Sequence, residues 1–254
     1  MPTTPPLSLQ LYTVRDALEQ DYDATMARIA AIGFRSVEPF NFVATAPQLA
    51  AALAANGLTA PSTHFNFLGT DADLDEVFAA AKTVGIPTVI EPYVAPERWA
   101  SADDIIATAE ALNAAAVVAA TYGVRIGYHN HAFEFANEFE VDGTLLTGYE
   151  LLAANLDPAV ILELDTYWAA AGGQDVPALL ARLGDRVRFI HIKDGPIEDD
   201  PKTQVAVGAG TMPIWDVIDA AKSLEYGVVE LDDTEGDMFT AVEDSYAYLT
   251  GSDK

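Results

Sequence analysis

Short apolar runs alternate along this chain with longer segments whose apolar residues recur every three or four positions. An uninterrupted short run is typical of a strand covered on both faces, and the longer spacing is typical of an amphipathic helix. The pattern predicts eight strands, at residues 7–13, 36–40, 58–65, 88–94, 124–131, 160–167, 187–194 and 227–232. It predicts helices at residues 21–32, 46–55, 74–84, 102–122, 145–155, 176–183, 214–224 and 238–249.

Eight strand-then-helix units predict a (β/α)8 TIM barrel, formed as a single domain over residues 1–254. A length of 254 residues with 50% hydrophobic content suits one large core of this size. The alternative is a doubly wound open sheet, which usually has fewer units and a glycine-rich phosphate turn after its first strand. Residues 10–15 contain no such turn, and only residues 195–211 form a long predicted loop.

The formal net charge of −26, from 39 acidic and 13 basic residues, excludes most nucleic-acid partners. A polyanion needs lysine and arginine to release its counterions, and this chain repels it. The same charge opposes phosphorylated substrates weakly, and an acidic surface also serves solubility. We therefore expect a small uncharged substrate and no nucleic acid.

Cysteine is absent, so any metal must be held by oxygen and nitrogen atoms. No run of about eighteen apolar residues is present, and residues 1–6 show no basic segment followed by an apolar one. We expect no membrane partner and a cytoplasmic protein.

Acids and histidines stand where four of the predicted strands end. They are His129, His131 and Glu134, then Glu163 and Asp165, then His191, Lys193 and Asp194, and finally Glu230 and Asp232. The carboxyl ends of barrel strands meet on one face, and burying these groups there is unfavourable without a cation or a hydrogen-bond network. The pattern predicts a divalent-metal enzyme.

Several of these residues keep a structural alternative beside the functional one. Glu163 and Asp165 share a strand face, and two inward carboxylates without a cation would repel, which favours a ligand or substrate role. Lys193 is a partner for a substrate oxygen or for Glu163, or half of a buried Lys–Glu pair. His64 and Glu38 end the third and second strands and either touch substrate or hold structure; Trp168 is a sugar-facing wall or simple packing.

The segments 8–16, 127–135, 163–168, 191–195, 208–210 and 229–231 together resemble the sugar phosphate isomerase/epimerase family of the xylose-isomerase-like barrel superfamily. Its members include ketose 3-epimerases, hydroxypyruvate isomerase, inosose dehydratase and enzymes that act on 3-oxo-glycosides. The resemblance implies a barrel enzyme that binds a metal ion, and it specifies the substrate only weakly.

The resemblance also implies a metal held by a carboxylate from strand 5, Asp from strand 6, His from strand 7 and Glu from strand 8. Asp165, His191 and Glu230 match the last three positions. Where ketose epimerases place Glu in strand 5, this chain has His129, and the nearest acid is Glu134. We favour Glu134 because hard ions prefer oxygen, with His129 as the alternative. Mn²⁺ is the expected ion, and Co²⁺, Mg²⁺ and Zn²⁺ are alternatives.

Such a site can stabilise the enediolate formed when a carbon beside a carbonyl loses its proton. We expect Glu230 or Glu134 to be the base, and His129, His131 and Lys193 to handle the substrate. Reprotonation gives epimerisation or isomerisation, and loss of a β-leaving group gives the lyase or dehydratase alternative. A non-catalytic sugar-binding barrel, or a supporting subunit of a homo- or hetero-oligomer, is the non-enzymatic alternative. A related three-zinc endonuclease is disfavoured by the charge and by a total of four histidines.

Overall fold

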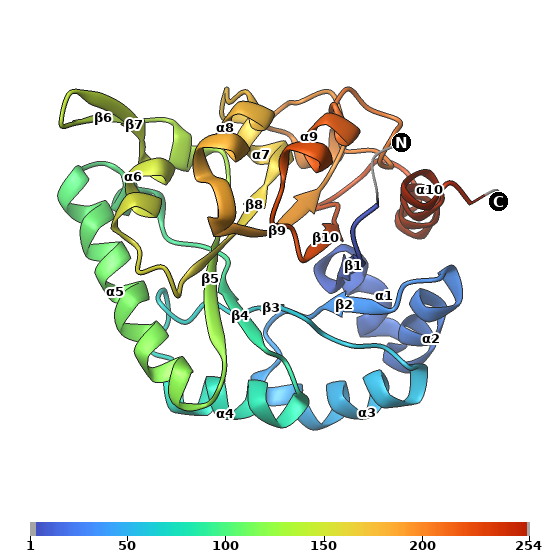
Figure 1. Cartoon of the computed structure of the whole chain (residues 1–254). Helices are drawn as coiled ribbons and strands as arrows, with labels where there is room; N and C mark the ends of the chain where they lie inside the picture. The colour runs from blue at the N-terminus through green and yellow to red at the C-terminus, as the bar shows by residue number, and fades with distance from the viewer. Residues whose placement is uncertain (1–3, 253–254) are drawn as a thin grey trace.

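Eight parallel strands form a ring in the computed structural model, which describes residues 4–252 (Figure 1). Their spatial order is β2-β1-β10-β9-β8-β5-β4-β3, and two isolated parallel bridges, Ser36 with Thr59 and Phe40 with His64, join the remaining seam. The bounds are β1 (Leu7–Gln10), β2 (Ser36–Glu38), β3 (Thr63–His64), β4 (Thr88–Glu91), β5 (Arg125–His129), β8 (Ile161–Asp165), β9 (Val187–Ile192) and β10 (Tyr226–Val229). The predicted (β/α)8 barrel is confirmed.

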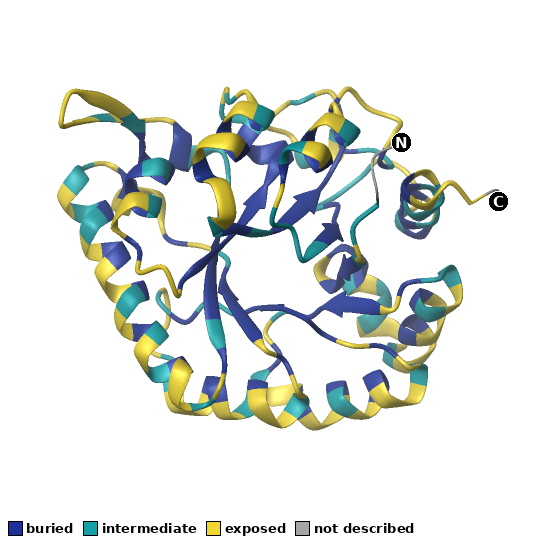
Figure 2. Cartoon of the chain, in the orientation of Figure 1, coloured by how far each residue is buried: buried dark blue, intermediate teal, exposed yellow. Residues whose placement is uncertain are grey.

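The helices surround this ring and turn their buried sides toward it (Figure 2). They are α1 (Arg15–Gln20), α2 (Tyr22–Ile32), α3 (Ala46–Asn56), α4 (Leu74–Val84), α5 (Ala102–Thr121), α6 (Gly148–Asn155), α7 (Thr166–Ala171), α8 (Val176–Leu183), α9 (Ile214–Ala220) and α10 (Met238–Thr250). Short 3₁₀ turns lie at Leu11–Val14, Val43–Thr45, Pro96–Trp99, Phe133–Phe135, Gly184–Arg186 and Pro201–Thr203. Burial of one stripe of each long helix against the strands supplies the hydrophobic core.

Most of the predicted strands end too late. The strand predicted at 160–167 stops at Asp165, because the Asp165 side chain accepts a hydrogen bond from the Trp168 N–H and caps α7. The strands predicted to reach residues 13, 65 and 94 likewise leave the ladder at Gln10, His64 and Glu91. The polar residues therefore stand at the last paired positions, where the chain turns toward the helices.

An exposed hairpin, β6 (Glu138–Val141) with β7 (Thr144–Thr147), was not predicted. Its turn has positive φ at Asp142 (49°) and Gly143 (81°), as a two-residue hairpin turn requires. The helix predicted from residue 145 was wrong at its start, because Thr147 caps a helix that begins at Gly148. The hairpin projects from the ring of helices beside α6 (Figure 1).

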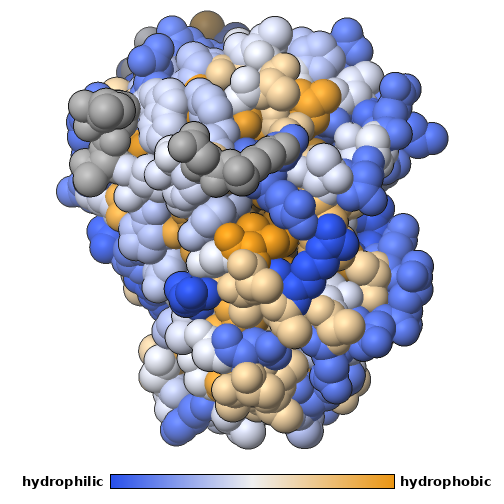
Figure 3. All heavy atoms as spheres, turned by 90° about the vertical axis from the view of Figure 1, so that its right-hand side faces the viewer, coloured by the Kyte–Doolittle hydropathy of each residue, from blue (hydrophilic) through white to orange (hydrophobic). Residues whose placement is uncertain are grey.

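Helix α5 is long and apolar enough by composition to span a membrane, which the sequence pattern did not predict. In the fold it is one of the outer helices, and its buried residues Ile105, Ala109 and Leu112 belong to the barrel core. The opposite side of the molecule, around α10, mixes hydrophilic side chains with small apolar groups (Figure 3).

One carboxylate anchors the long loop between β9 and α9. Asp194 Oδ1 accepts from the N–H groups of Gly195 (2.8 Å) and Met212 (3.0 Å), and Oδ2 accepts from Gly208 (2.8 Å) and Gly210 (3.1 Å). A Cβ atom on Gly210 would overlap this carboxylate, so glycine is required there. The N–H groups of the 208–210 turn are thus engaged within the fold and do not form a phosphate cradle.

Candidate functional site

A polar side chain ends six of the eight barrel strands, and the residues directly after β9 and β10 are polar as well. The last residues of these six strands are Gln10, Glu38, His64, Glu91, His129 and Asp165. His191 and Glu163 lie within β9 and β8, and Lys193 and Glu230 directly follow β9 and β10. None is more than 8% exposed. Parallel strands bring these ends to one face of the barrel, and their burial makes partners obligatory.

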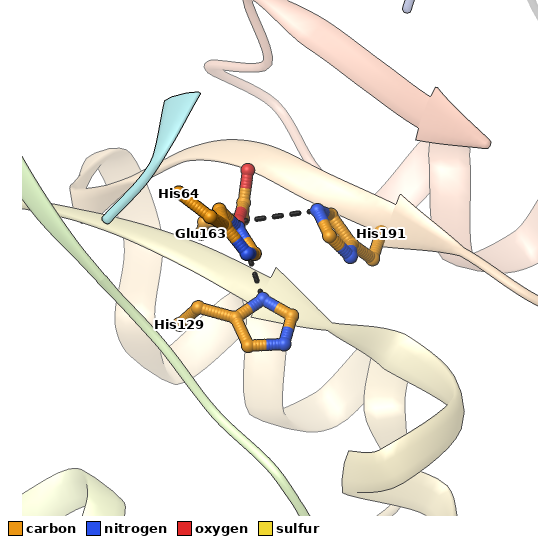
Figure 4. A group of neighbouring side chains, drawn as sticks. All are labelled: His64, His129, Glu163 and His191. Atoms are coloured by element: carbon orange, nitrogen blue, oxygen red, sulfur yellow. Dashed lines mark hydrogen bonds and ion pairs between the residues drawn. The ribbon is translucent and has the colours of Figure 1, made fainter. Parts of the chain in front are cut away.

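Three histidines converge on one carboxylate oxygen at the centre of this face (Figure 4). Glu163 Oε2 lies 2.5 Å from His64 Nε2, 3.2 Å from His129 Nδ1 and 3.2 Å from His191 Nε2. The His64 and His191 rings are stacked, with centroids 5.1 Å apart and planes 5° from parallel. Strands β3, β5, β8 and β9 each contribute one of the four residues.

Glu38 completes the cluster from β2. Its Oε1 lies 2.8 Å from His191 Nε2 and 3.3 Å from His64 Nε2, and it accepts a 2.8 Å hydrogen bond from Gln10. Its Oε2 accepts from the hydroxyl of Ser62. Burial, and then the nearby charge of Glu163, raises the pKa of Glu38 above its ordinary value.

The histidines of the cluster differ in charge. Burial opposes protonation of His191, but the carboxylates of Glu163 and Glu230 raise the pKa of His191 well above its ordinary value. Burial, and then the charge of His191, lowers the pKa of His129 well below its ordinary value. Burial likewise opposes protonation of His64, but the carboxylates of Glu38 and Glu163 raise the pKa of His64 above its ordinary value. Without a bound cation, protonation is therefore favoured at His64 and His191 and disfavoured at His129.

Lys193 forms a second cluster beside the histidines. Its Nζ lies 2.9 Å from Asp165 Oδ2, 2.9 Å from Glu230 Oε2 and 2.7 Å from Asp232 Oδ2. Burial opposes its charge, but these carboxylates raise the pKa of Lys193 well above its ordinary value. Lys193 is thus a buried cation held by these three acids. It does not pair with Glu163, which was one of the alternatives that the sequence left open.

Glu134 lies apart from both clusters. Its Oε1 accepts a 2.9 Å hydrogen bond from the Tyr128 hydroxyl, and its Oε2 accepts a 2.9 Å hydrogen bond from the His131 N–H. The side chain is buried and stabilises the turn that follows β5. The structure therefore does not bring Glu134 together with Asp165, His191 and Glu230.

A cavity of about 320 Å³ opens above the histidines. It is lined by His64, His129 and Glu230 from the clusters and by Tyr12, Phe40, Asn41, Asn66, Pro92, Tyr93, His131 and Asp232. The volume is at the small end of the range of small-molecule sites, about 300–1,000 Å³. Of the described residues that line it, none is lysine or arginine.

His131 reaches this cavity, whereas Trp168 packs below it. The His131 ring stacks on Phe133 at 5.4 Å, and its Nδ1 has no hydrogen-bond partner among residues 4–252. Trp168 is 8% exposed and its Nε1 donates to Asp232 Oδ2 at 3.2 Å. Trp168 thus helps to position Asp232 and does not line the cavity.

Gln10 and Glu91 belong to the face but were not singled out from the sequence, and Asp232 was noted at a strand end without a role. Gln10 and Glu91 had the same signal as the others, a polar residue ending an apolar strand. Glu91 accepts from the N–H groups of Phe67 (2.8 Å), Leu68 (2.7 Å) and Tyr93 (3.2 Å), and burial raises its pKa to about 7. It anchors the loops that form the cavity rim.

Within residues 4–252, two sets of side chains place their donor atoms within 4.8 Å of one another. One is His64, His129, Glu163 and His191, and the other is Asp165, His191 and Glu230. Nitrogen and carboxylate oxygen are suitable donors for a divalent ion in both. In the first set, Glu163 Oε1 is buried without a hydrogen-bond partner in the described structure, as expected beside a cation. In the second set, Lys193 already contacts both carboxylates.

Comparisons with known proteins agree with this architecture. A family model described as a xylose isomerase-like TIM barrel matches residues 26–247. No curated protein sequence matches the chain.

Solved structures with the same fold carry several different names. A sugar phosphate isomerase/epimerase from Parabacteroides distasonis ATCC 8503 is 24% identical, with a TM-score of 0.81 over 97% of this chain and 93% of that one. The IOLI protein, described with a binding zinc atom, is 15% identical, with a TM-score of 0.74 over 97% and 98%. The probable 3-DHS dehydratase AsbF of Bacillus anthracis is 14% identical, with a TM-score of 0.74 over 96% and 98%. At these identities the likeness concerns the fold.

Proposed function

The chain belongs to the xylose isomerase-like TIM barrel family, and from this premise we propose that it is a divalent-metal-dependent enzyme that isomerises or epimerises a neutral sugar or keto-sugar through an enediolate. The observation that carries the proposal is the convergence of buried imidazole and carboxylate donors at the base of a cavity of about 320 Å³. A bound divalent ion would stabilise the negative charge that develops on a carbonyl oxygen when the adjacent carbon loses its proton. A structural neighbour described with a zinc atom supports a metal in this fold.

Glu230 is the better placed of the two carboxylates that the sequence suggested as base. It lines the cavity, and its Oε2 is held by His191 Nδ1 at 2.5 Å and Lys193 Nζ at 2.9 Å. Glu134 does not line the cavity, and both of its oxygens already accept hydrogen bonds. A general base must reach the proton that it removes, which favours Glu230.

The other cavity residues bind and orient the sugar. His129 and His131 line the cavity and present their imidazole rings to it. Tyr12 and Tyr93 are each 40% exposed and offer apolar faces to a sugar ring. Lys193 does not face a substrate oxygen directly; it fixes Glu230 and Asp232 in place.

A neutral substrate follows from the charges around the cavity. Its described lining contains the acids Glu230 and Asp232, and the net charge of the chain is −26. A phosphate group would meet these carboxylates without a compensating cation. We therefore propose a small neutral sugar as the partner and, from the acidic cysteine-free composition, a cytoplasmic location.

A lyase reaction is the second candidate, because a structural neighbour is named as a probable dehydratase. Proton loss beside a carbonyl is the shared first step, and expulsion of a β-leaving group would replace reprotonation. The same residues would serve both reactions.

Solvent deuterium exchange tests the shared step. The metal-loaded enzyme is incubated in D₂O with neutral ketoses, inososes and 3-oxo-glycosides, and the metal-stripped enzyme is the control. We expect deuterium at the carbon beside the carbonyl of a turned-over substrate. Because internal transfer can hide this label, the same substrate deuterated at the reacting carbon is also used with the Glu230→Asp variant. Metal-dependent turnover without a primary isotope effect would contradict an enediolate mechanism.

A further inference from the structure

The arrangement around Glu163 resembles a set of metal ligands more than a set of ion pairs. Two of the three nitrogen-to-oxygen separations are 3.2 Å. Ligand atoms around a tetrahedral zinc ion, with bonds of about 2.0–2.1 Å, are separated by about 3.3 Å. His129 Nδ1 and His191 Nε2 thus already lie from Glu163 Oε2 at nearly the spacing that one ion imposes, His64 Nε2 lies closer at 2.5 Å, and the four residues have donor atoms within 4.8 Å of one another.

An unpartnered oxygen is the second observation. Glu163 is 0% exposed, and its Oε1 has no hydrogen-bond partner in the described part of the chain. An ionised carboxylate has about four acceptor positions, and leaving one oxygen bare inside a barrel is unfavourable. A cation beside Glu163 would remove that penalty.

The contacts of the two His191 ring nitrogens agree with a ligand role. Glu230 Oε2 lies 2.5 Å from His191 Nδ1, and because a carboxylate only accepts, the proton resides on Nδ1. The Nε2 atom faces Glu163 and Glu38, and an ion bound there would replace the Nε2 proton while the Nδ1 proton stays on the Glu230 side. A carboxylate behind a metal-binding histidine is a common orienting partner, so this contact assigns Glu230 a supporting position.

The other donor set already contacts a buried cation. Lys193 Nζ lies 2.9 Å from the carboxylates of both Asp165 and Glu230, and 2.7 Å from that of Asp232. A divalent ion bound between Asp165 and Glu230 would meet this buried ammonium or displace it from three ion pairs. Like charges at such separation in a desolvated site repel strongly.

The strand register accounts for the departure at strand 5. The chain has His129 where a carboxylate would otherwise be expected, and the residue paired with His129 on the neighbouring strand β8 is Glu163. The carboxylate of this donor set is therefore supplied by β8, the strand that pairs with β5. His64 from β3 supplies the third imidazole of this donor set.

We propose that the resident divalent ion is held by His64, His129, His191 and Glu163, and that Asp165 and Glu230 are not its ligands. This assignment deepens the proposed function and rests on it only for the presence of a catalytic ion. Three imidazoles and one carboxylate favour Zn²⁺ or Co²⁺ over Mg²⁺. The assignment also leaves the Glu230 carboxylate available to the substrate.

Zinc binding by variants that belong to only one donor set separates the two sites. The protein is stripped with a chelator and reloaded with Zn²⁺, and the dissociation constant and zinc content per chain are measured. We expect His64→Ala and Glu163→Gln to weaken zinc binding at least 100-fold. Asp165→Asn should weaken it by about tenfold at most, the lower end of the range of effects behind the ligands. Glu134→Gln is the matched control and should bind zinc as the wild type does. Loss of zinc from Asp165→Asn together with its retention by His64→Ala would overturn the assignment.

X-ray absorption of the zinc-loaded wild type provides a test that no folding defect can obscure. Imidazole rings produce a characteristic multiple-scattering pattern whose strength reports their number. We expect three imidazoles per zinc, and a single imidazole with carboxylate oxygens would overturn the proposal. Wild-type protein that binds no divalent ion would overturn it as well. Since neither measurement uses a substrate, zinc at the three histidines without deuterium exchange in any sugar would refute the proposed reaction and leave the metal site standing.

Discussion

The two ends of the barrel pair their charged side chains in opposite ways. At the N-terminal end, Glu225 Oε1 accepts hydrogen bonds from Arg125 at 2.9 Å and from Arg188 at 2.8 Å, and its Oε2 accepts another from Arg125. Arg125 also donates to the hydroxyl of Thr88. At the C-terminal end, the carboxylates of Glu38, Glu163, Asp165, Glu230 and Asp232 share Lys193 and three histidines.

This difference in pairing indicates that one end of the sheet contributes to stability and the other end to function. Both oxygens of Glu225 have cationic partners, so nothing further is needed at that end. Among the described residues, the other end retains one bare oxygen, Glu163 Oε1, and has five carboxylates against one lysine and three histidines. In barrel enzymes the carboxyl end of the sheet carries the chemistry and the opposite end contributes to stability.

The largest contrast is expected in turnover. Glu230→Gln should lower it by about 10²–10⁴-fold, because the amide cannot accept the substrate proton. Glu225→Gln, the matched change at the opposite end, should leave turnover within about twofold. Steady-state kinetics of both variants, loaded with the same ion, measure the contrast. Equal losses of turnover in the two variants would contradict a functional difference between the two ends of the barrel.

The next contrast concerns the buried ammonium. Lys193→Met should lower the free energy of unfolding by about 3–5 kcal/mol, because it leaves Asp165, Glu230 and Asp232 without their shared cation. Lys222→Met is the control on the surface, with an expected change below about 0.5 kcal/mol. Urea unfolding of metal-free protein at pH 7 gives both values. A Lys193→Met protein as stable as the wild type would mean that these ion pairs are energetically neutral.

A smaller effect on stability is expected at the other end. Glu225→Gln should lower the free energy of unfolding by about 1 kcal/mol, because its ion pairs with Arg125 and Arg188 are partly exposed and screened by solvent. The difference from wild type should shrink when salt is added. An effect as large as that of Lys193→Met would show that exposure does not weaken these pairs.

The smallest expected effect is a change with pH in the difference in free energy of unfolding between wild type and Glu225→Gln. Hydrogen bonds from Arg125, despite some opposing burial, hold the pKa of Glu225 at about 2, below its ordinary value of 4.5. A depressed pKa in the folded state adds stability above the unfolded value, and that stability is lost as the pH falls toward the folded value. The gap between wild type and Glu225→Gln should therefore be full above pH 4.5 and vanish near pH 2. A gap that is unchanged across this window would contradict the depressed pKa.

Much of the barrel was predictable because periodicity reports burial directly. The bounds of α4 and α8 match the predicted segments 74–84 and 176–183 to the residue. The hairpin was missed although Asp142-Gly143 is a common turn pair, because its strands are short and exposed and carry little periodic signal. Strand ends were misjudged because the capping role of Asp165 depends on the following turn.

The site was predictable as a set of strand ends but not as a set of partners. Asp165, His191 and Glu230 do lie together, as their positions after apolar runs suggested. The partner of Lys193 depends on an irregular register at Leu162 and Glu163, where β8 meets β9. The separation of Glu134 from the cluster depends on the 3₁₀ turn after β5. No pattern in a single sequence reports such local geometry.

Asp194 has a thermodynamic consequence for the loop that follows β9. Four N–H groups of the loop from residue 195 to residue 212 bind its carboxylate before any ligand arrives. The conformational entropy of that loop is therefore lost during folding, so binding of a small molecule does not have to order it. The 195–212 loop therefore adds little entropic cost to ligand binding at the carboxyl end of the barrel.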